Sequence, residues 1–448
     1  GSPVEVYDMK FRLGQIFIFA AVLMIASVGM VGCDTEEIQY EEAESRIQYW
    51  LPLNATVSKS AATADLAYMM NVVETNHCLA ANGIPEDVNA QFELEAKRLS
   101  ANPTVCDVWT SVGRIMSRLS DSQSNVTFVP DVSETLDAQV ELRSEDVYIT
   151  IGNMKAKLIS INDVSVDQMW NKFKEQSSYD NLYQAKLMFE SALSDSAQLT
   201  ALGAKKFGQN SVSVRYEYNG KETKQSVSFS RVPVKPSSYS DYDFVYYEID
   251  RPNNVALLTL NKCLYNDVYT ETLRDFFADV KEEGIDNIAI DLRGNSSGSD
   301  EAAYEFMRYI DVKEYFGFNV VTRGDSVISQ NQKVKVRNDI YSDLAYDGDV
   351  YVLTSDETAN AAVTFSVLLQ DNGIAKVIGA VPSSSPSHYD DVTEFRLPYT
   401  GLIIKITHTH FIRPDLSKVN QTYQKPDYQT DSQKAFDKLY EVVGKKRS

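Results

Sequence analysis

The residues best suited to chemistry lie in one short polar segment late in the chain, which contains Ser384, Ser385, Ser387, His388 and Asp390. Serine, histidine and aspartate are the residue types of a hydrolytic triad, in which a base activates a hydroxyl group for attack on a carbonyl carbon. A triad is defined by geometry, however, and a serine-rich loop contains such neighbours by chance. A solvated loop is therefore the favoured interpretation of this segment, and a serine hydrolase site is the alternative.

Histidine is scarce, since the chain has four His and four Cys in 448 residues. His408 and His410 are two positions apart, so they share one face of a predicted strand. Two such imidazoles can bind a metal ion, but no acidic or thiol ligand stands near them in the sequence. We interpret the pair as part of an edge strand and predict neither a metal site nor a cofactor.

The composition narrows the class of protein. Acidic residues number 63 against 43 basic ones, for a net charge of −20, and hydrophobic residues make up 43%. Nucleic acid is an improbable partner, because a phosphate backbone needs a cationic face. The hydrophobic content is that of a globular protein, and the length predicts two or three domains.

The first 33 residues have the pattern of an export signal. Lys10 and Arg12 precede an apolar run over residues 16–31, which ends at Gly32 and Cys33. This pattern predicts a bacterial lipoprotein that is cleaved before Cys33 and lipidated on it, so that the membrane is one partner. An uncleaved membrane anchor is the alternative. Residues 1–8 precede the only plausible start Met and are taken as upstream sequence or an expression scar, and residues 34–58 as a polar tether.

The next part of the chain, residues 59–130, has helical periodicity. Apolar residues recur at helical spacing from Leu66 to Val73 and from Val108 to Leu119, with a charged helix between them. Cys78 and Cys106 flank that charged helix. In a protein outside the cytoplasm they form either a disulfide or two free thiols, and the sequence leaves both alternatives open. Cys263 is interpreted as a core thiol.

Residues 137–232 are predicted to be rich in β-strands, with embedded helices over 166–170 and 180–202. The clearest signal is a hairpin, in which alternating runs over 211–218 and 223–229 are joined by Asn219 and Gly220. The proline-containing stretch 232–238 predicts a linker.

Strands and helices alternate from residue 244 to the end. Apolar runs over 255–260, 288–292, 350–353 and 376–378 are separated by helical patterns. This alternation predicts an α/β fold with a largely parallel sheet that is covered on both faces. Ligands in such sheets bind at the carboxyl ends of the strands, where two polar turns, 291–298 and 354–360, enter helices.

These two turns carry a resemblance to the tail-specific, or C-terminal processing, serine peptidase family. The run from Ile290 to Asn295 resembles the family's D-L-R-G-N turn, and residues 350–379 resemble its nucleophile strand, helix and following strand. Further similarities, some of them to a lipoprotein branch of the family in Gram-positive bacteria, extend the likeness over residues 60–420. They lie at residues 75–77, 119–121, 159–164, 368–373 and 413–415.

The resemblance implies a peptidase-type spiral β/α core over 240–448, an N-terminal helical domain over 59–130 and a small PDZ-like β-rich insert over 137–232. It implies peptide-bond hydrolysis by a Ser at the start of the helix after the second turn. One branch of the family activates this Ser with a Lys, and another uses a His together with a Glu.

The catalytic positions implied by the family are all substituted in this chain. The nucleophile position is Asn360, whose amide is a poor nucleophile. The Lys position falls on Ser385, which has no pKa suited to a base. The His position falls on Gln123, and the Glu position on Ala380.

The backbone groups of an oxyanion hole do not depend on side chains, so they can survive these substitutions. The predicted donors are the N–H groups of Gly294, Asn295, Ser296, Ser297 and Ala361. We therefore predict a membrane-tethered pseudopeptidase that binds a peptide or an unfolded protein segment without cleaving it. An active serine peptidase with a rewired site is the alternative, and a different hydrolytic or transfer activity is a third reading.

Overall fold

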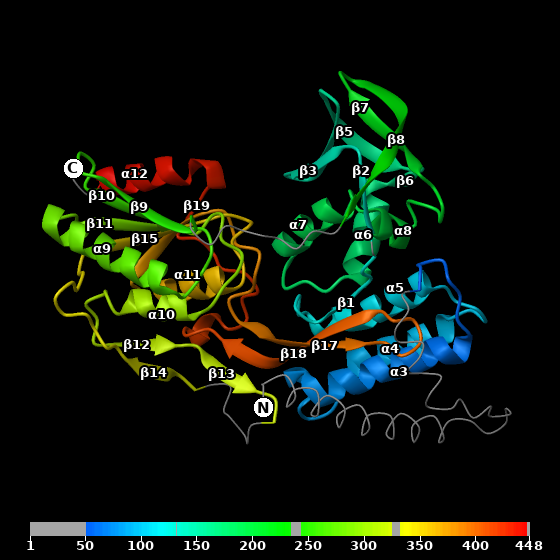
Figure 1. Ribbon diagram of the computed structural model, residues 1–448, viewed down its shortest axis with the longest axis horizontal. Coiled ribbons are helices and arrows are strands. Elements are labelled where there is room, and N and C mark those ends of the chain that lie inside the picture. Colours follow the sequence, from blue (N-terminus) through cyan, green and yellow to red (C-terminus); the bar gives the residue numbers. More distant parts are fainter. Residues whose placement is uncertain (1–50, 131, 234–242, 325–331, 446–448) are drawn as a thin grey trace. The chain divides into compact units, whose positions relative to one another are not determined.

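The computed structural model describes residues 51–130, 132–233, 243–324 and 332–445 (Figure 1). Contacts divide these residues into two compact units. The first unit contains the described residues up to 178, together with 192–233 and 391–408, and the second contains 179–191, 243–390 and 409–445. Cys33, the rest of the predicted signal and most of the predicted tether lie outside the described residues, as does most of the predicted linker 232–238. No helix in the described ranges has the length and apolar character that crossing a bilayer requires.

Three helices of the first unit confirm the helical periodicity. They are α3 (Lys59–Asn76), α4 (Glu86–Arg98) and α5 (Val105–Met116), accompanied by the short 3₁₀ turns η1 (Cys78–Ala80) and η2 (Ser117–Leu119). Thr104 begins α5 with a capping box, because its side chain accepts the Asp107 N–H and the Asp107 carboxylate accepts the Thr104 N–H. Leu66 and Met69 of α3 are buried in the same cluster as Val112 of α5.

An antiparallel sheet forms the β-rich part of the first unit. Its strands are β2 (Val132–Leu136), β3 (Gln139–Arg143), β4 (Asp146–Ile151), β5 (Met154–Ile161), β6 (Val164–Ser165), β7 (Ser211–Tyr218) and β8 (Lys221–Pro233). The order is β2-β8-β7-β5-β4-β3, and β6 pairs with β5. Helices α6 (Val166–Gln176) and α8 (Ser196–Ala201) belong to the same unit.

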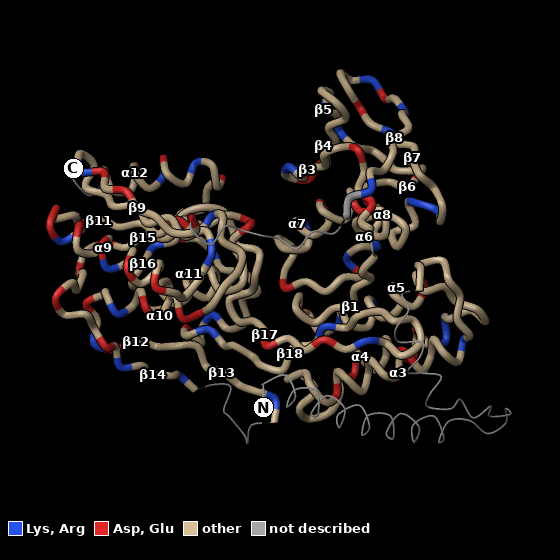
Figure 2. The backbone as a smooth tube through the Cα atoms, viewed as in Figure 1, with Lys and Arg blue, Asp and Glu red and all other residues tan. Residues whose placement is uncertain are grey.

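The predicted hairpin is confirmed as β7 and β8. Asn219 and Gly220 both have positive φ, of 51° and 75°, as a two-residue hairpin turn requires. Basic and acidic residues lie along the hairpin, as the blue and red segments of β7 and β8 in Figure 2 show. Lys224 and Arg215 pair with Asp163 at 2.9 and 3.4 Å. The likeness of this sheet to a PDZ domain stays a prediction.

Residues 391–408 join the helices of the first unit, although sequence reasoning assigned all of 240–448 to the core. They contain most of β17 (His388–Arg396) and the first part of β18 (Ile403–Ile412), which pairs with β1 (Asn125–Thr127). Leu397, Ile404 and Ile406 are fully buried in the cluster formed by the helices. This apolar face explains why the segment belongs with the helices.

The second unit has the predicted parallel sheet, covered on both faces. Its strands are β9 (Val245–Asp250), β10 (Val255–Leu260), β11 (Asn287–Asp291), β15 (Asp349–Thr354), β16 (Ala375–Gly379) and β19 (Tyr428–Gln429), in the order β19-β16-β15-β11-β10-β9. All neighbours are parallel except β9, which runs antiparallel to β10.

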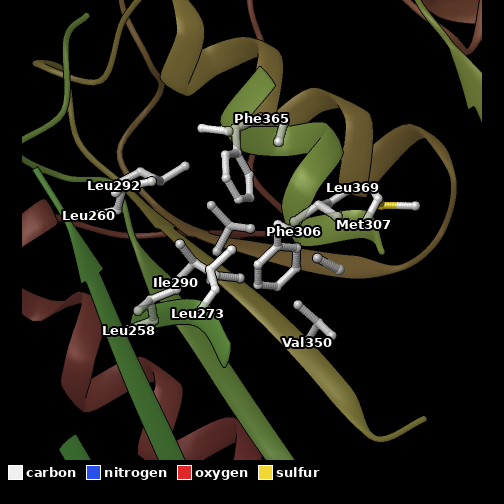
Figure 3. Packing of buried hydrophobic residues seen from close by; sticks show 14 of the residues in the cluster. Leu258, Leu260, Leu273, Ile290, Leu292, Phe306, Met307, Val350, Phe365 and Leu369 are labelled. Carbon is white, nitrogen blue, oxygen red and sulfur yellow. The ribbon is translucent and has the colours of Figure 1, made fainter. Parts of the chain in front are cut away.

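The two faces of this sheet have separate cores, because side chains alternate along each strand. On one face, Ile290 and Val350 pack against α9 (Asp267–Glu283), α10 (Glu301–Met307) and α11 (Ala361–Asp371); Figure 3 shows Phe306 and Phe365 in this cluster. On the other face, Tyr351 and its neighbours pack against α12 (Ala435–Lys445).

The remaining elements of the second unit are short. They are α7 (Leu182–Ala192), β12 (Glu314–Gly317), β13 (Asn319–Thr322), β14 (Val334–Arg337), η3 (Leu416–Lys418) and η4 (Ser432–Lys434). β12 pairs with β14, and β13 pairs with the end of β18 from Thr409 to Ile412.

Candidate functional site

The first turn of the site leaves the carboxyl end of β11 and is anchored by Arg293. Its guanidinium makes two hydrogen bonds of 2.9 Å to the carboxylate of Asp291. It also donates to the carbonyl of Ser432 at 2.9 Å and lies 4.3 Å from the ring centre of Phe436. The planar group thus joins the start of the turn to the C-terminal segment of the chain.

The middle of the turn is fixed by Asn295, whose side chain is fully buried. Its Nδ2 donates to the carbonyl of Leu260 at 3.0 Å. The backbone carbonyl of Asn295 accepts the N–H of Ala359 at 3.1 Å. The turn ends at Gly298, where φ is 130° and a Cβ would lie 2.2 Å from the carbonyl oxygen of Cys263. Only glycine fits this close approach of two backbones.

The second turn leaves β15 and is bound to the first by two hydroxyl groups. Thr358 Oγ1 donates to the carbonyl of Leu292 at 2.8 Å, and Ser355 Oγ donates to the carbonyl of Arg293. Thr358 Oγ1 also accepts the N–H of Ser355 at 2.9 Å. Sequence reasoning missed both residues. Their signal is that Ser and Thr before a helix commonly bond to nearby backbone groups.

Asn360 ends the second turn in an unusual backbone conformation, with φ 54° and ψ −124°. This lies outside the regions that residues other than glycine ordinarily occupy. The exposed side chain donates from Nδ2 to the carbonyl of Ser296 at 2.8 Å, and the Asn360 N–H donates to Ser384 Oγ at 2.9 Å. A sharp strand-to-helix turn of this kind presents the nucleophile in serine hydrolases.

The predicted oxyanion donors divide into two groups. The N–H of Asn295 donates to the carbonyl of Leu292 at 3.1 Å, and that of Ser297 donates to Asn295 Oδ1 at 3.4 Å. By contrast, the N–H groups of Gly294, Ser296 and Ala361 have no acceptor in the described part of the chain. Ala361 is the first residue of α11, where the helix dipole also favours a negatively polarised ligand atom.

A third loop, after β16, completes this group of turns. Ala380 exchanges two hydrogen bonds with Thr354, of 3.2 Å from its N–H and 2.8 Å to its carbonyl. The N–H of Ser385 donates to Asp180 Oδ2 at 3.1 Å, and the Ser385 side chain is buried. Positions 360, 380 and 385, which the resemblance assigns to catalysis, therefore lie on two adjoining turns at one edge of the sheet.

The serine-rich segment does not form the alternative triad. His388 Nδ1 lies 3.2 Å from the carbonyl of Pro386, and its ring stacks on Phe411 at 5.2 Å. Ser387 Oγ instead accepts the N–H of Arg413 at 3.1 Å. Among the described residues, no serine hydroxyl makes a hydrogen bond to His388.

Comparison with known proteins identifies this arrangement. Residues 254–430, which include all three turns, match peptidase family S41. The chain carries a family S41 peptidase domain. Such a domain implies peptides or proteins as the class of substrate. None of the curated proteins compared with the chain matches it.

Two solved structures of mature CPAF share the fold of most of the chain. Mature CPAF complexed with lactacystin is 12% identical and has a TM-score of 0.62, over 86% of this chain and 97% of that chain. A second structure of mature CPAF gives the same identity and TM-score, over 86% and 96%. The photosystem II D1 C-terminal processing protease is 14% identical over 86% and 97%, with a TM-score of 0.45.

Gln123, at the His position of the S41 resemblance, belongs to the first unit. Its N–H donates to Asp121 Oδ1 at 3.0 Å. The buried Asp121 carboxylate also accepts from His77 Nε2 at 3.0 Å, Ser124 Oγ at 2.6 Å and Thr407 Oγ1 at 2.7 Å. His77 Nδ1 lies 3.2 Å from the backbone nitrogen of Leu79.

Burial raises the pKa of Asp121, but the hydrogen bond and charge of His77, with the two hydroxyl groups, outweigh burial and lower it. Asp121 therefore stays ionised inside the unit. Sequence reasoning noted His77 only as part of a motif and missed its role. A His directly after a helix, among few histidines, was the available signal.

The histidine pair and the cysteines add no further site. His410 stacks on Tyr389 at 4.3 Å, and the carbonyl of His408 accepts a hydrogen bond from Cys78 Sγ at 3.3 Å. The described residues contain no group of three His, Cys, Asp or Glu placed to hold a metal ion. Cys78, Cys106 and Cys263 form no disulfide with one another, and Cys263 is buried as predicted.

Proposed function

We propose that this protein is a membrane-tethered S41 pseudopeptidase that binds peptides or unfolded protein segments without cleaving them. The observation that carries the proposal is the residue at position 360 and the contacts that it makes. The turn that would present a nucleophile carries an asparagine instead, and its side-chain amide donates a hydrogen bond to the carbonyl of Ser296. Nearby backbone N–H groups have no acceptor among the described residues. A peptide carbonyl or carboxylate can bind such donors, but no hydroxyl attacks it.

The substitutions at the other catalytic positions support the same proposal. Ser385 and Ala380 carry no base, and Gln123 carries none in the first unit. The alternative, an active peptidase with a rewired site, requires a base beside a hydroxyl group. His388 has no serine partner among the described residues, which favours the binding protein over the enzyme.

Binding and cleavage are tested together on the purified protein lacking residues 1–33. Fluorescence anisotropy with labelled unstructured peptides should show saturable binding, while casein and the same peptides stay intact. Asn360→Asp should weaken binding by about tenfold, because a carboxylate at this position competes for the N–H groups and repels peptide oxygens. Asn360→Gln, which keeps the amide, is the matched control. Turnover that disappears on mutation of Ser385 or His388 would establish the active-peptidase alternative instead.

Restoring the hydroxyl group gives a second test. Asn360→Ser should not produce a fast enzyme, because the variant still lacks a base. A covalent adduct of this variant with a fluorophosphonate probe would contradict the proposal, since it requires an activated serine.

The tether is part of the proposal and rests on the sequence of residues 9–33. Mass spectrometry of the membrane-extracted protein should find acyl chains on Cys33 as the first residue. Recovery of an intact segment from Met9 to Gly32 would favour the uncleaved anchor. In both cases we propose that the body of the protein lies outside the cytoplasm.

A further inference from the structure

We propose that Asn360 is a site of spontaneous conversion to an aspartyl residue, driven by the backbone of the folded protein. In the first step, the backbone nitrogen of Ala361 bonds to Cγ of Asn360 while the Cγ–Nδ2 bond breaks. The Ala361 amide proton passes to solvent, the Nδ2 group takes a proton from solvent and leaves as ammonia, and a succinimide ring remains. Water then opens the ring at either carbonyl and gives aspartate or isoaspartate, so the balance is one water consumed and one ammonia released.

The backbone of Asn360 already has the shape that this ring requires. In a succinimide, Cβ, Cα, the carbonyl carbon and the next nitrogen lie nearly in one plane. Viewed along the Cα–C bond of Asn360, Cβ lies about a third of a turn from the nitrogen of the same residue. At a ψ of −124°, the dihedral angle from Cβ to the nitrogen of Ala361 is therefore close to zero, so the two atoms are eclipsed. Most asparagines must leave a helical or extended conformation to reach this shape, whereas the fold holds Asn360 in it.

The attacking nitrogen is also available. The N–H of Ala361 makes no hydrogen bond within the described ranges, so ring closure breaks none at this nitrogen. It is the first amide of α11, and the positive end of the helix dipole stabilises the negative charge that develops as the proton leaves. Asn360 is exposed, so water reaches the ring.

The hydrogen bond of the Asn360 side chain to Ser296 opposes the reaction. Asn360 Nδ2 is the leaving nitrogen, and its 2.8 Å hydrogen bond to the carbonyl of Ser296 must break. The inference therefore rests on the backbone rather than on the side-chain contact. A turn that presents a serine hydroxyl places no electrophilic carbon beside the next amide, whereas an asparagine in the same turn does.

The test is peptide mapping by mass spectrometry after incubation of the full chain at mildly alkaline pH. The peptide containing Asn360 should gain the mass that separates a carboxyl group from an amide, and should contain isoaspartate. The conversion should be about tenfold faster in the folded protein than in the same chain held in denaturant, because only the fold fixes ψ. Asn219, which precedes Gly220, serves as the internal control for the chemistry in both samples. Equal or slower conversion at position 360 in the folded protein would overturn the inference.

Asn360→Gln is the matched variant. Its longer side chain would have to close a six-membered ring, so the signal at position 360 should disappear while that at Asn219 stays. Persistence of a mass gain in this peptide would assign the change to another residue and overturn the inference. A loss of peptide affinity as conversion proceeds would follow only if the proposed function also holds, whereas the mass measurement is independent of it.

Discussion

The turn that carries Asn360 and the loop that carries Gln123 are held by different kinds of interaction. Around Asn360, neutral hydroxyl groups of Ser355 and Thr358 bond to backbone carbonyls of the neighbouring turn. Around Gln123, one buried carboxylate, that of Asp121, collects His77, two hydroxyl groups and a backbone N–H. Each scaffold holds a backbone position that the family resemblance assigns to catalysis.

A second buried carboxylate in the first unit sharpens the comparison. Asp65 accepts the N–H groups of Tyr399 and Thr400 and the hydroxyl group of Thr400, but it has no cationic partner among these contacts. Burial outweighs these hydrogen bonds and raises the pKa of Asp65 to about 6. Burial with a histidine thus keeps a carboxylate charged, whereas burial with neutral donors alone makes its charge costly.

The largest expected effect is that of Asp121→Ala. The change leaves His77 and two hydroxyl groups buried without their acceptor, so the free energy of unfolding should fall by about 3–5 kcal/mol. Urea unfolding monitored by circular dichroism measures it. Glu93→Ala, at an exposed position in the same unit, should stay within about 0.5 kcal/mol of the parent. A loss of less than about 1 kcal/mol for Asp121→Ala would mean that the network contributes little.

The next largest effect is that Asp65 and Asp121 contribute to the free energy of unfolding with opposite dependences on pH. The raised pKa of Asp65 means that its contribution to stability is fully present below the unfolded value of 3.8 and is lost as pH rises to about 6, by roughly 3 kcal/mol at most. The lowered pKa of Asp121 means that its contribution is present above 3.8 and is lost as pH falls through the folded value.

The measurement is the free energy of unfolding of Asp65→Asn and Asp121→Asn relative to the parent, between pH 2 and pH 7. The difference between Asp65→Asn and the parent should become more favourable to the variant as pH rises. The destabilisation by Asp121→Asn should be greatest at neutral pH and shrink in acid. Parallel pH profiles for the two variants would refute the contrast.

A smaller effect is expected for Thr358→Val, which has nearly the same shape but no hydroxyl group. It removes one of the two donors to the carbonyl of Leu292 and leaves the N–H of Ser355 without its acceptor, at a cost of about 1–3 kcal/mol in unfolding free energy. Thr272→Val in α9 is the control, since Thr272 Oγ1 bonds only to its own helix at Val268. Equal effects of the two variants would show that the bond between the turns is not special.

The smallest effect tests the strain at position 360. Asn360→Gly should be more stable than Asn360→Ala by about 1–2 kcal/mol, because both lose the bond to Ser296 and only glycine adopts φ 54°, ψ −124° without strain. Thermal unfolding of the pair measures the difference. The usual order, in which alanine is the more stable, would mean that the turn relaxes when the side chain is removed.

Much of the fold was predictable because it depends on residue patterns within short stretches of the sequence. Period-3.6 apolar residues predicted the helices α3 and α5, and Asn219 with Gly220 predicted the hairpin turn. Apolar strands alternating with helices predicted the parallel sheet and the edge at which its turns meet. The resemblance to the peptidase family located Asn360 and Ala380 on those turns.

Contacts between distant segments could not be read in the same way. Residues 391–408 look like part of an alternating α/β region, yet their apolar face packs with Leu66 and Val112 in the first unit. Asp121 and Thr407 are 286 positions apart, and no local sequence pattern predicts the 2.7 Å hydrogen bond between them.

By itself, then, the sequence determined the elements, the family resemblance and the residue types at the positions that the resemblance assigns to catalysis, because each depends on residue types and short spacings. Only the tertiary structure decided which N–H groups lack acceptors, which carboxylate has a histidine partner and which ψ Asn360 adopts. Those properties depend on distances between turns and on burial, which arise when the whole chain has packed.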